Sequence, residues 1–244
     1  MSTHLNVARY HLIQRGNFLV MPWAWLAFGF CVDLVIFALI PAGHHDALTA
    51  HGTVQVTDVS GRDAGGLGSI FAVFLSVGIT SVARSLPFAL TLGVSRRSYY
   101  LGTALTGGVL AVAYGLTITL LQAIERATGG WGVSAHIFQV PYILDGPWYL
   151  TWLTSTVALA LLFTYGMWIG VVHRRWNVAG TMTFGAAQVT VAVAAIWLVT
   201  WGHAWSGTGR FFTALSAAGL TGVLAALACV LLAGGYLTVR RAAV

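Results

Sequence analysis

The sequence predicts an all-α integral membrane protein with six transmembrane helices and both termini in the cytoplasm. Of its 244 residues, 58% are hydrophobic and only 7% are charged, and the mean hydropathy is +0.82. This composition excludes both a soluble globular domain and a disordered chain. A helix needs about 20 apolar residues to cross a bilayer, so the chain holds several spans and little else. A single transmembrane domain over residues 1–244 is expected.

The N-terminal segment, residues 1–17, has apolar side chains at helical spacing beside Arg9 and Arg15. The pattern is typical of an elbow helix on the membrane surface, and a cationic tail that only sets orientation explains it equally well. The apolar run that follows is too long for a signal-peptide core and lacks a cleavage site, so it is expected to be retained. The six expected spans are residues 18–40, 67–83, 101–123, 148–172, 178–202 and 211–236.

The connections between the spans alternate in character. Residues 41–66 are polar, acidic and rich in turn formers, which predicts an external loop. Residues 124–147 form a second external segment, more apolar than an ordinary loop and partly on the outer surface. Residues 173–177 predict a short inner turn, and residues 207–210 are expected to precede the sixth span.

Two spans carry small residues four positions apart, a pattern that permits close contact between membrane helices. These ridges are Gly107, Ala111 and Gly115 in the third span, and Ala218, Gly222 and Ala226 in the sixth.

The charges decide the orientation, because cytoplasmic loops of membrane proteins collect arginine and lysine. Nine of the twelve arginines fall on one side of the predicted layout, whereas five acidic residues fall on the other. The first side is therefore assigned to the cytoplasm. Its arginines are Arg9, Arg15, Arg84, Arg96, Arg97, Arg174, Arg175, Arg240 and Arg241; the acidic residues opposite are Asp46, Asp58, Asp63, Glu125 and Asp145.

Several functional classes are excluded or disfavoured. The chain has no lysine, so it cannot contain a phosphate-binding loop ending in Gly-Lys-Ser/Thr. Its arginines are spread over short loops, which membrane topology explains better than nucleic-acid binding. No histidine lies at mid-membrane, and the run His44-His45-Asp46 lacks the spacing of a metal site, so no bound metal or haem is expected. Enzyme signatures and inner-face carboxylates are also missing.

A polar bridge, residues 84–102, separates the second and third spans and carries its own helix signals. Pro87 suits the first turn of a short helix, and Gly93 suits the left-handed residue that ends one. Ser95 can cap the next helix. Arg96 and Arg97 would then sit at the positive end of that helix, where a cation costs about 0.3–1 kcal/mol. Another role is therefore expected for these two charges.

The run Pro-Phe-Ala-Leu-Thr-Leu-Gly-Val-Ser-Arg-Arg-Ser-Tyr-Tyr-Leu-Gly, residues 87–102, resembles the connection between spans two and three of ABC-2-type exporter permeases. In that family the connection is a coupling helix that rests in a cleft of the ATPase subunit. The resemblance implies that this bridge couples to an ATPase, although a loop that only sets topology remains an alternative. The coupling residues would be Pro87, Phe88, Leu90, Leu92, Gly93, Val94, Ser95, Arg96 and Arg97.

The resemblance also implies the partners. Two copies of a separate ATPase subunit would hold ATP and Mg, and a second permease subunit, identical or related, would complete the transporter in a bacterial cell membrane. This chain itself would bind no cofactor and would export an amphipathic or lipophilic substrate. A membrane scaffold or sensor, and an outward-facing enzyme that uses His136, Asp145 or the residue 44–46 cluster, remain the alternatives.

Three polar residues within spans are candidates for a substrate path. Asp33 is the only acidic residue inside a span, and an ionisable group at that depth is a functional-site hypothesis. It could meet a cationic substrate, or it could be protonated or hydrogen-bonded to Gln188, Thr190 or Ser155. Gln188 and Thr190 would line a path if they face inward. The tryptophans near the outer interface, by contrast, are explained by an aromatic belt.

Overall fold

The computed structural model describes residues 20–39, 66–131, 137–138 and 146–241, and the regular structure in these ranges is helical throughout. Four helical stretches are long and apolar enough to cross a membrane, at residues 70–91, 96–128, 148–201 and 217–239. The predicted elbow helix, the first external loop and the two chain ends lie outside the described residues. The helices are α2 (Met21–Leu39), α4 (Gly66–Ala83), α5 (Ser85–Thr91), α6 (Arg96–Thr128), α7 (Trp148–Trp201), α8 (Trp205–Ala214) and α9 (Ala217–Arg241).

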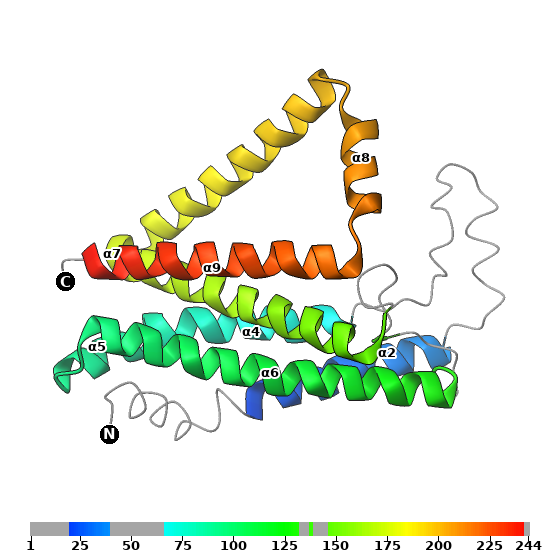
Figure 1. Cartoon of the computed structure of the whole chain (residues 1–244). Helices are drawn as coiled ribbons and strands as arrows, with labels where there is room; N and C mark the ends of the chain where they lie inside the picture. Colours follow the sequence, from blue (N-terminus) through cyan, green and yellow to red (C-terminus); the bar gives the residue numbers. More distant parts are fainter. Residues whose placement is uncertain (1–19, 40–65, 132–136, 139–145, 242–244) are drawn as a thin grey trace.

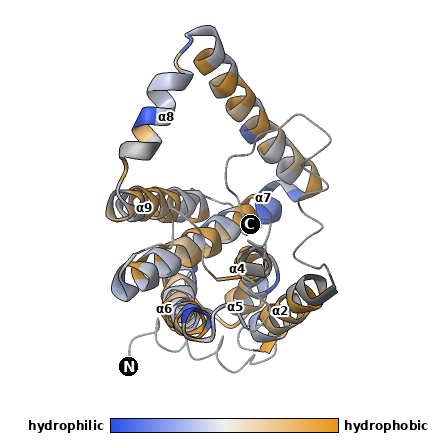
Figure 2. Cartoon of the chain, turned by 90° about the vertical axis from the view of Figure 1, so that its right-hand side faces the viewer, coloured by the Kyte–Doolittle hydropathy of each residue, from blue (hydrophilic) through white to orange (hydrophobic). Residues whose placement is uncertain are grey.

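The helices α2, α4, α6 and α9 and the first part of α7 lie side by side as a bundle (Figures 1 and 2). Its two ends are called here the α5 end, where α4 passes through α5 into α6, and the far end, where α6 finishes and α7 begins. The closest packing joins α4 to α7 through glycines. A Cβ on Gly78 would lie 2.3 Å from the Phe163 carbonyl oxygen, and one on Gly166 would lie 2.3 Å from the Leu75 carbonyl oxygen. Only glycine allows this approach of the two backbones.

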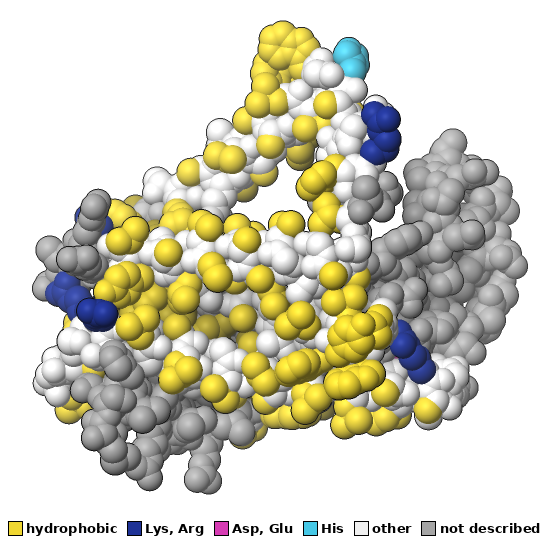
Figure 3. All heavy atoms as spheres, in the orientation of Figure 1, with side chains coloured by type: hydrophobic (Ala, Val, Ile, Leu, Met, Phe, Trp, Pro, Cys, Tyr) yellow, Lys and Arg dark blue, Asp and Glu magenta, His cyan; other side chains and the backbone are white. Residues whose placement is uncertain are grey.

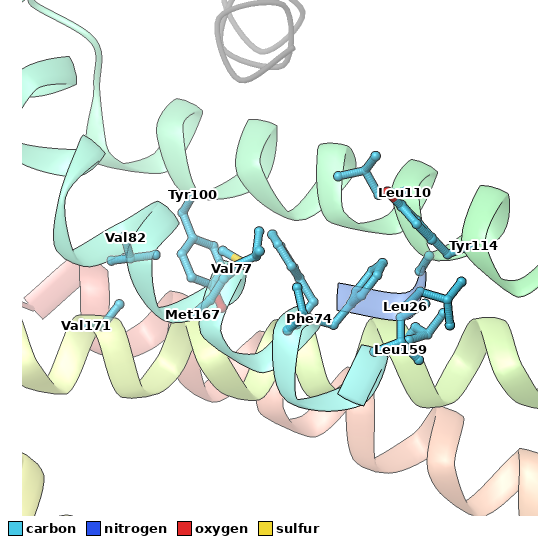
Figure 4. Close-up of a cluster of buried hydrophobic side chains, with 14 of the residues drawn as sticks. Leu26, Phe74, Val77, Val82, Tyr100, Leu110, Tyr114, Leu159, Met167 and Val171 are labelled. Atoms are coloured by element: carbon cyan, nitrogen blue, oxygen red, sulfur yellow. The ribbon is translucent and has the colours of Figure 1, made fainter. Parts of the chain in front are cut away.

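The core of the bundle runs along α4, with side chains from its neighbours pointing into it (Figure 4). Phe74 and Val77 of α4 meet Tyr114 of α6 and Met167 of α7, and all four are less than 9% exposed. The rings of Phe74 and Tyr114 pack edge to face, with centroids 5.2 Å apart. Leu26 joins this cluster from α2.

The small-residue ridge predicted for residues 107–115 makes the expected close contact. A Cβ on Gly107 would lie 2.1 Å from the Phe163 ring, and one on Gly115 would lie 2.3 Å from Thr156 Oγ1. The second ridge makes no such contact within the described chain, because Ala218, Gly222 and Ala226 are exposed and a Cβ on Gly222 would meet nothing within 4 Å.

Helix α7 changes direction at Asn177, whose backbone angles (φ 56°, ψ −156°) are not helical. The break lies in the predicted inner turn, and these backbone angles fall in a region that is almost exclusive to glycine, so the break is strained. Side chains tie the two arms together beyond the break. His173 Nδ1 lies 3.1 Å from Thr181 Oγ1, and the rings of Trp168 and Phe184 pack 5.2 Å apart.

The second arm of α7, residues 178–201, then leaves the bundle, and α8 returns the chain to α9 (Figure 1). Every residue from 189 to 198 is exposed on this arm. The arm is strongly apolar, whereas α8 carries polar residues (Figure 2). The arm has about the length of a membrane span, and its side-chain contacts with the first arm include those of Thr181, Phe184 and Gln188.

The helix boundaries differ from the predicted span boundaries in two regions. The expected sixth span, residues 211–236, is interrupted, because α8 ends at Ala214 and α9 begins at Ala217. Ser216 precedes α9, and its Oγ accepts a hydrogen bond from Gly219 N at 3.1 Å, the geometry of a helix N-cap. Residues 207–210, expected to lie in a connection before this span, belong to α8. Helix α6 also continues to Thr128, five residues past Ala123, into the segment expected to be an external loop.

Candidate functional site

The bridge at the α5 end folds as its local signals predict. Helix α5 buries Ser85, Leu86 and Ala89 against the bundle, and Pro87 lies in its first turn. On its other side Phe88 is 50% exposed and Leu92 is 64% exposed. Leu90 and Val94 are partly buried against the core. A helix of two turns thus fixes one apolar face to the bundle and presents a second apolar face outward.

The turn after α5 is closed by backbone hydrogen bonds. Gly93 has φ +78°, as expected for the residue that ends a helix, and Val94 N donates to the Ala89 carbonyl at 3.1 Å. Ser95 Oγ accepts from Ser98 N at 3.1 Å, which makes Ser95 the N-cap of α6. One turn further on, the Tyr99 hydroxyl donates to the Ser81 carbonyl of α4. The bridge is therefore anchored to both helices that it joins.

Arginines gather at the α5 end. Arg84 lies at the junction of α4 and α5, and Arg96 and Arg97 begin α6. Arg174 and Arg175 join them because α7 runs alongside α4, with a Cβ on Gly170 only 2.7 Å from the Ile79 carbonyl. The space-filling view shows arginine side chains at this end and no acidic side chain of a described residue on the visible face (Figure 3).

Two of the three proposed substrate-path residues, Gln188 and Thr190, have described side chains. Gln188 and Thr190 lie on the projecting arm of α7, apart from α2 (Figure 1). Gln188 accepts a hydrogen bond from the Tyr165 hydroxyl across the two arms, and Thr190 Oγ1 donates to the Ala186 carbonyl of its own helix. Asp33 belongs to α2, but its side chain is outside the described residues.

Buried hydroxyl groups lie instead between α7 and its neighbours. Thr154 and Thr221 are 1% and 4% exposed, and their Oγ1 atoms are 2.6 Å apart across α7 and α9. The hydroxyl of Thr221 already donates to the Ala217 carbonyl, so Thr154 is the donor of this bond. Ser155 Oγ and Thr156 Oγ1, next along α7, are buried without a hydrogen-bond partner in the described chain. These groups make the interior of the bundle polar where sequence periodicity gave no indication of it.

Glu125 is the functional-site candidate that the sequence missed. It was expected in an external loop, but it lies in the last turn of α6 with 0% exposure. Its Oε2 accepts three N–H bonds, from Trp131 Nε1 at 2.9 Å, Ile137 N at 2.9 Å and Phe138 N at 3.0 Å. Gln122 Nε2 adds a bond to the Phe138 carbonyl at 3.3 Å. The carboxylate therefore holds a separate piece of chain against the far end of the bundle.

Aromatic rings cover this carboxylate. Phe30 of α2 packs against Trp131 at 4.8 Å and against Phe138 at 6.0 Å between ring centroids. Trp131 has φ 59°, a conformation that costs energy in a bulky residue and that the bond to Glu125 stabilises. Glu125 Oε1 is buried with no hydrogen-bond partner among the described residues. The only feature of the sequence that could have pointed to this site is the spacing of Gln122 and Glu125, three positions apart.

Among the residues that the structure describes, no three His, Cys, Asp or Glu residues lie close enough together to hold a metal ion.

The chain matches no model of a known protein family, no curated protein and no solved structure.

Proposed function

We propose that this chain is the membrane subunit of a bacterial ATP-driven exporter of the ABC-2 type. In this proposal the membrane is crossed six times, by α2, α4, α6, the two arms of α7, and α9, with the α5 end in the cytoplasm. ATP and Mg are held by two copies of a separate ATPase subunit, and a second permease subunit completes the transporter. The substrate is amphipathic or lipophilic and moves outward.

The observation that carries the proposal is the two-faced α5. Leu86 and Ala89 fasten it to the bundle, while Phe88 and Leu92 project from the arginine-rich end as an apolar pair. An exposed apolar pair beside positive charge suits docking to a soluble protein, since buried aromatic anchors dominate binding energies. Force applied at α5 would reach α4 directly and α6 through the short turn at Gly93.

The bundle supports the same mechanism at its far end. Transport requires an exit that opens, and there Glu125 holds the segment at Ile137 and Phe138 through side-chain bonds rather than through a continuous helix. If α5 moved α6, the Glu125 carboxylate would move with it and would carry along the segment bound at Ile137 and Phe138. The buried hydroxyls of Thr154 and Ser155 lie between these two ends, on the α7 arm that packs along α6.

Co-expression with an ATPase chain that carries a phosphate-binding loop tests the proposal. Phe88→Glu combined with Leu92→Glu is expected to abolish co-purification of that ATPase, whereas Phe88→Tyr with Leu92→Met retains it because apolar bulk is conserved. Arg96→Glu with Arg97→Glu is expected to weaken the complex as well. Unchanged complex yield in the first double variant, with correct membrane insertion, contradicts docking through α5.

A further inference from the structure

We propose that the cavity between the start of α6 and the end of α9 binds the phosphate-bearing headgroup of an anionic phospholipid. The cavity has a volume of about 340 Å³ and is lined by Arg96, Arg97, Tyr236 and Val239. Sites for small ligands have volumes of about 300–1,000 Å³, so a headgroup is of suitable size.

The packing of α6 on α9 fixes the walls of this cavity. The Tyr100 hydroxyl donates to the Leu232 carbonyl at 3.1 Å, and the ring of Tyr100 lies 6.2 Å from that of Tyr236. A Cβ on Gly235 would lie 2.2 Å from the Tyr100 hydroxyl oxygen, so the two helices touch here. The cavity lies beside this contact, and the described residues that line it all belong to α6 and α9.

Charge identifies the ligand as an anion. The sequence contains no Asp or Glu between residues 66 and 124 or between residues 146 and 244. The helices that line the cavity therefore supply no carboxylate side chain there; the one acid of α6, Glu125, lies at the far end. Two arginines also stand at the N-terminus of α6, where the helix dipole already favours negative charge. A phosphate group between them would offset the cost of placing two cations at this end of the helix.

The surroundings identify the source as a lipid rather than a soluble phosphate. The outward side of α9 carries an apolar stripe that begins next to the cavity, with Leu237 53%, Val230 66% and Val223 52% exposed. Acyl chains can lie along this stripe while the headgroup enters the cavity. Basic pockets at the ends of transmembrane helices bind anionic headgroups in this way.

Native mass spectrometry tests the site on the full chain extracted from vesicles of equal parts phosphatidylglycerol and phosphatidylcholine. Retention of phosphatidylglycerol over phosphatidylcholine is expected. Arg96→Gln with Arg97→Gln is expected to weaken phosphatidylglycerol binding about thirtyfold, equivalent to about 2 kcal/mol for two arginines. Arg84→Gln, at the same end but not lining the cavity, is the matched control and is expected to leave binding unchanged.

Val239→Trp separates the site from the exporter proposal. It fills the cavity while leaving both arginines and the outward face of α5 intact, so lipid binding is expected to fall and ATPase co-purification to persist. Equal lipid retention by the double glutamine variant and the native chain overturns the site. Displacement of the lipid by inorganic phosphate at matched concentration overturns the lipid source. Either result leaves docking through Phe88 and Leu92 untouched.

Discussion

Replacing Glu125 by leucine is expected to release the segment held at the far end of the bundle. The change removes the acceptor of three N–H groups, those of Trp131 Nε1, Ile137 and Phe138. A buried donor left without a partner costs about 1–3 kcal/mol, which gives about 3–9 kcal/mol if all three stay buried. The segment can instead move into water, which limits the loss. A decrease in the free energy of unfolding of about 3–5 kcal/mol is therefore expected.

The measurement is unfolding of the purified chain in mixed micelles by titration with a denaturing detergent, followed by tryptophan fluorescence. Glu125→Gln keeps one carbonyl oxygen of similar position and is expected to lose less, about 1–2 kcal/mol. Ala123→Leu, an exposed change on the same helix, serves as the control. Hydrogen exchange adds a local readout, because the Ile137 and Phe138 amides are expected to exchange faster in the leucine variant.

A stability of Glu125→Leu within about 0.5 kcal/mol of the native chain, the range of ordinary surface substitutions, would refute this reasoning. Unchanged exchange at Ile137 and Phe138 would refute it independently, since the carboxylate would then not be what protects these amides.

Two further substitutions test the packing of α7. Gly78→Ala places a Cβ 2.3 Å from the Phe163 carbonyl oxygen and is expected to cost about 1–3 kcal/mol in the same unfolding assay, whereas Gly185→Ala meets nothing within 4 Å and is expected to stabilise slightly; equal effects would rule out the glycine contact. Thr154→Val and Thr221→Val, alone and combined, are expected to show a coupling energy of about 0.5–1 kcal/mol for their 2.6 Å hydrogen bond, and strictly additive losses would argue that the bond is absent.

The features that local chemistry specifies were predicted from the sequence alone. The left-handed Gly93, the cap at Ser95 and the start of α6 at Arg96 each depend on a residue's own backbone preferences and its immediate neighbours. Long apolar runs predicted the all-helical fold for the same reason, because the backbone must satisfy its hydrogen bonds internally where water is absent. The gathering of arginines at the α5 end was expected because these arginines lie in the connections predicted on one side of the membrane.

The candidate sites depended on contacts between distant residues, which periodicity does not encode. Glu125 is a charged residue in a segment whose sequence resembles a loop. It becomes a buried hydrogen-bond acceptor only because Ile137 and Phe138 return to the end of α6. The close contact at Gly78 could not be predicted from the sequence, because it depends on Gly166 of α7 lying opposite Gly78.

The amino-acid sequence by itself therefore determined the helix ends that are marked by strong local signals such as Gly93 and Ser95. It also determined which end of the bundle carries the positive charge. The tertiary structure decided which faces meet, that the second arm of α7 leaves the bundle, and that Arg96 and Arg97 share a cavity with Tyr236 and Val239. The physical reason is that caps and helix breaks act over one turn. The position of one helix against another depends on side-chain shape at contacts that are far apart along the chain.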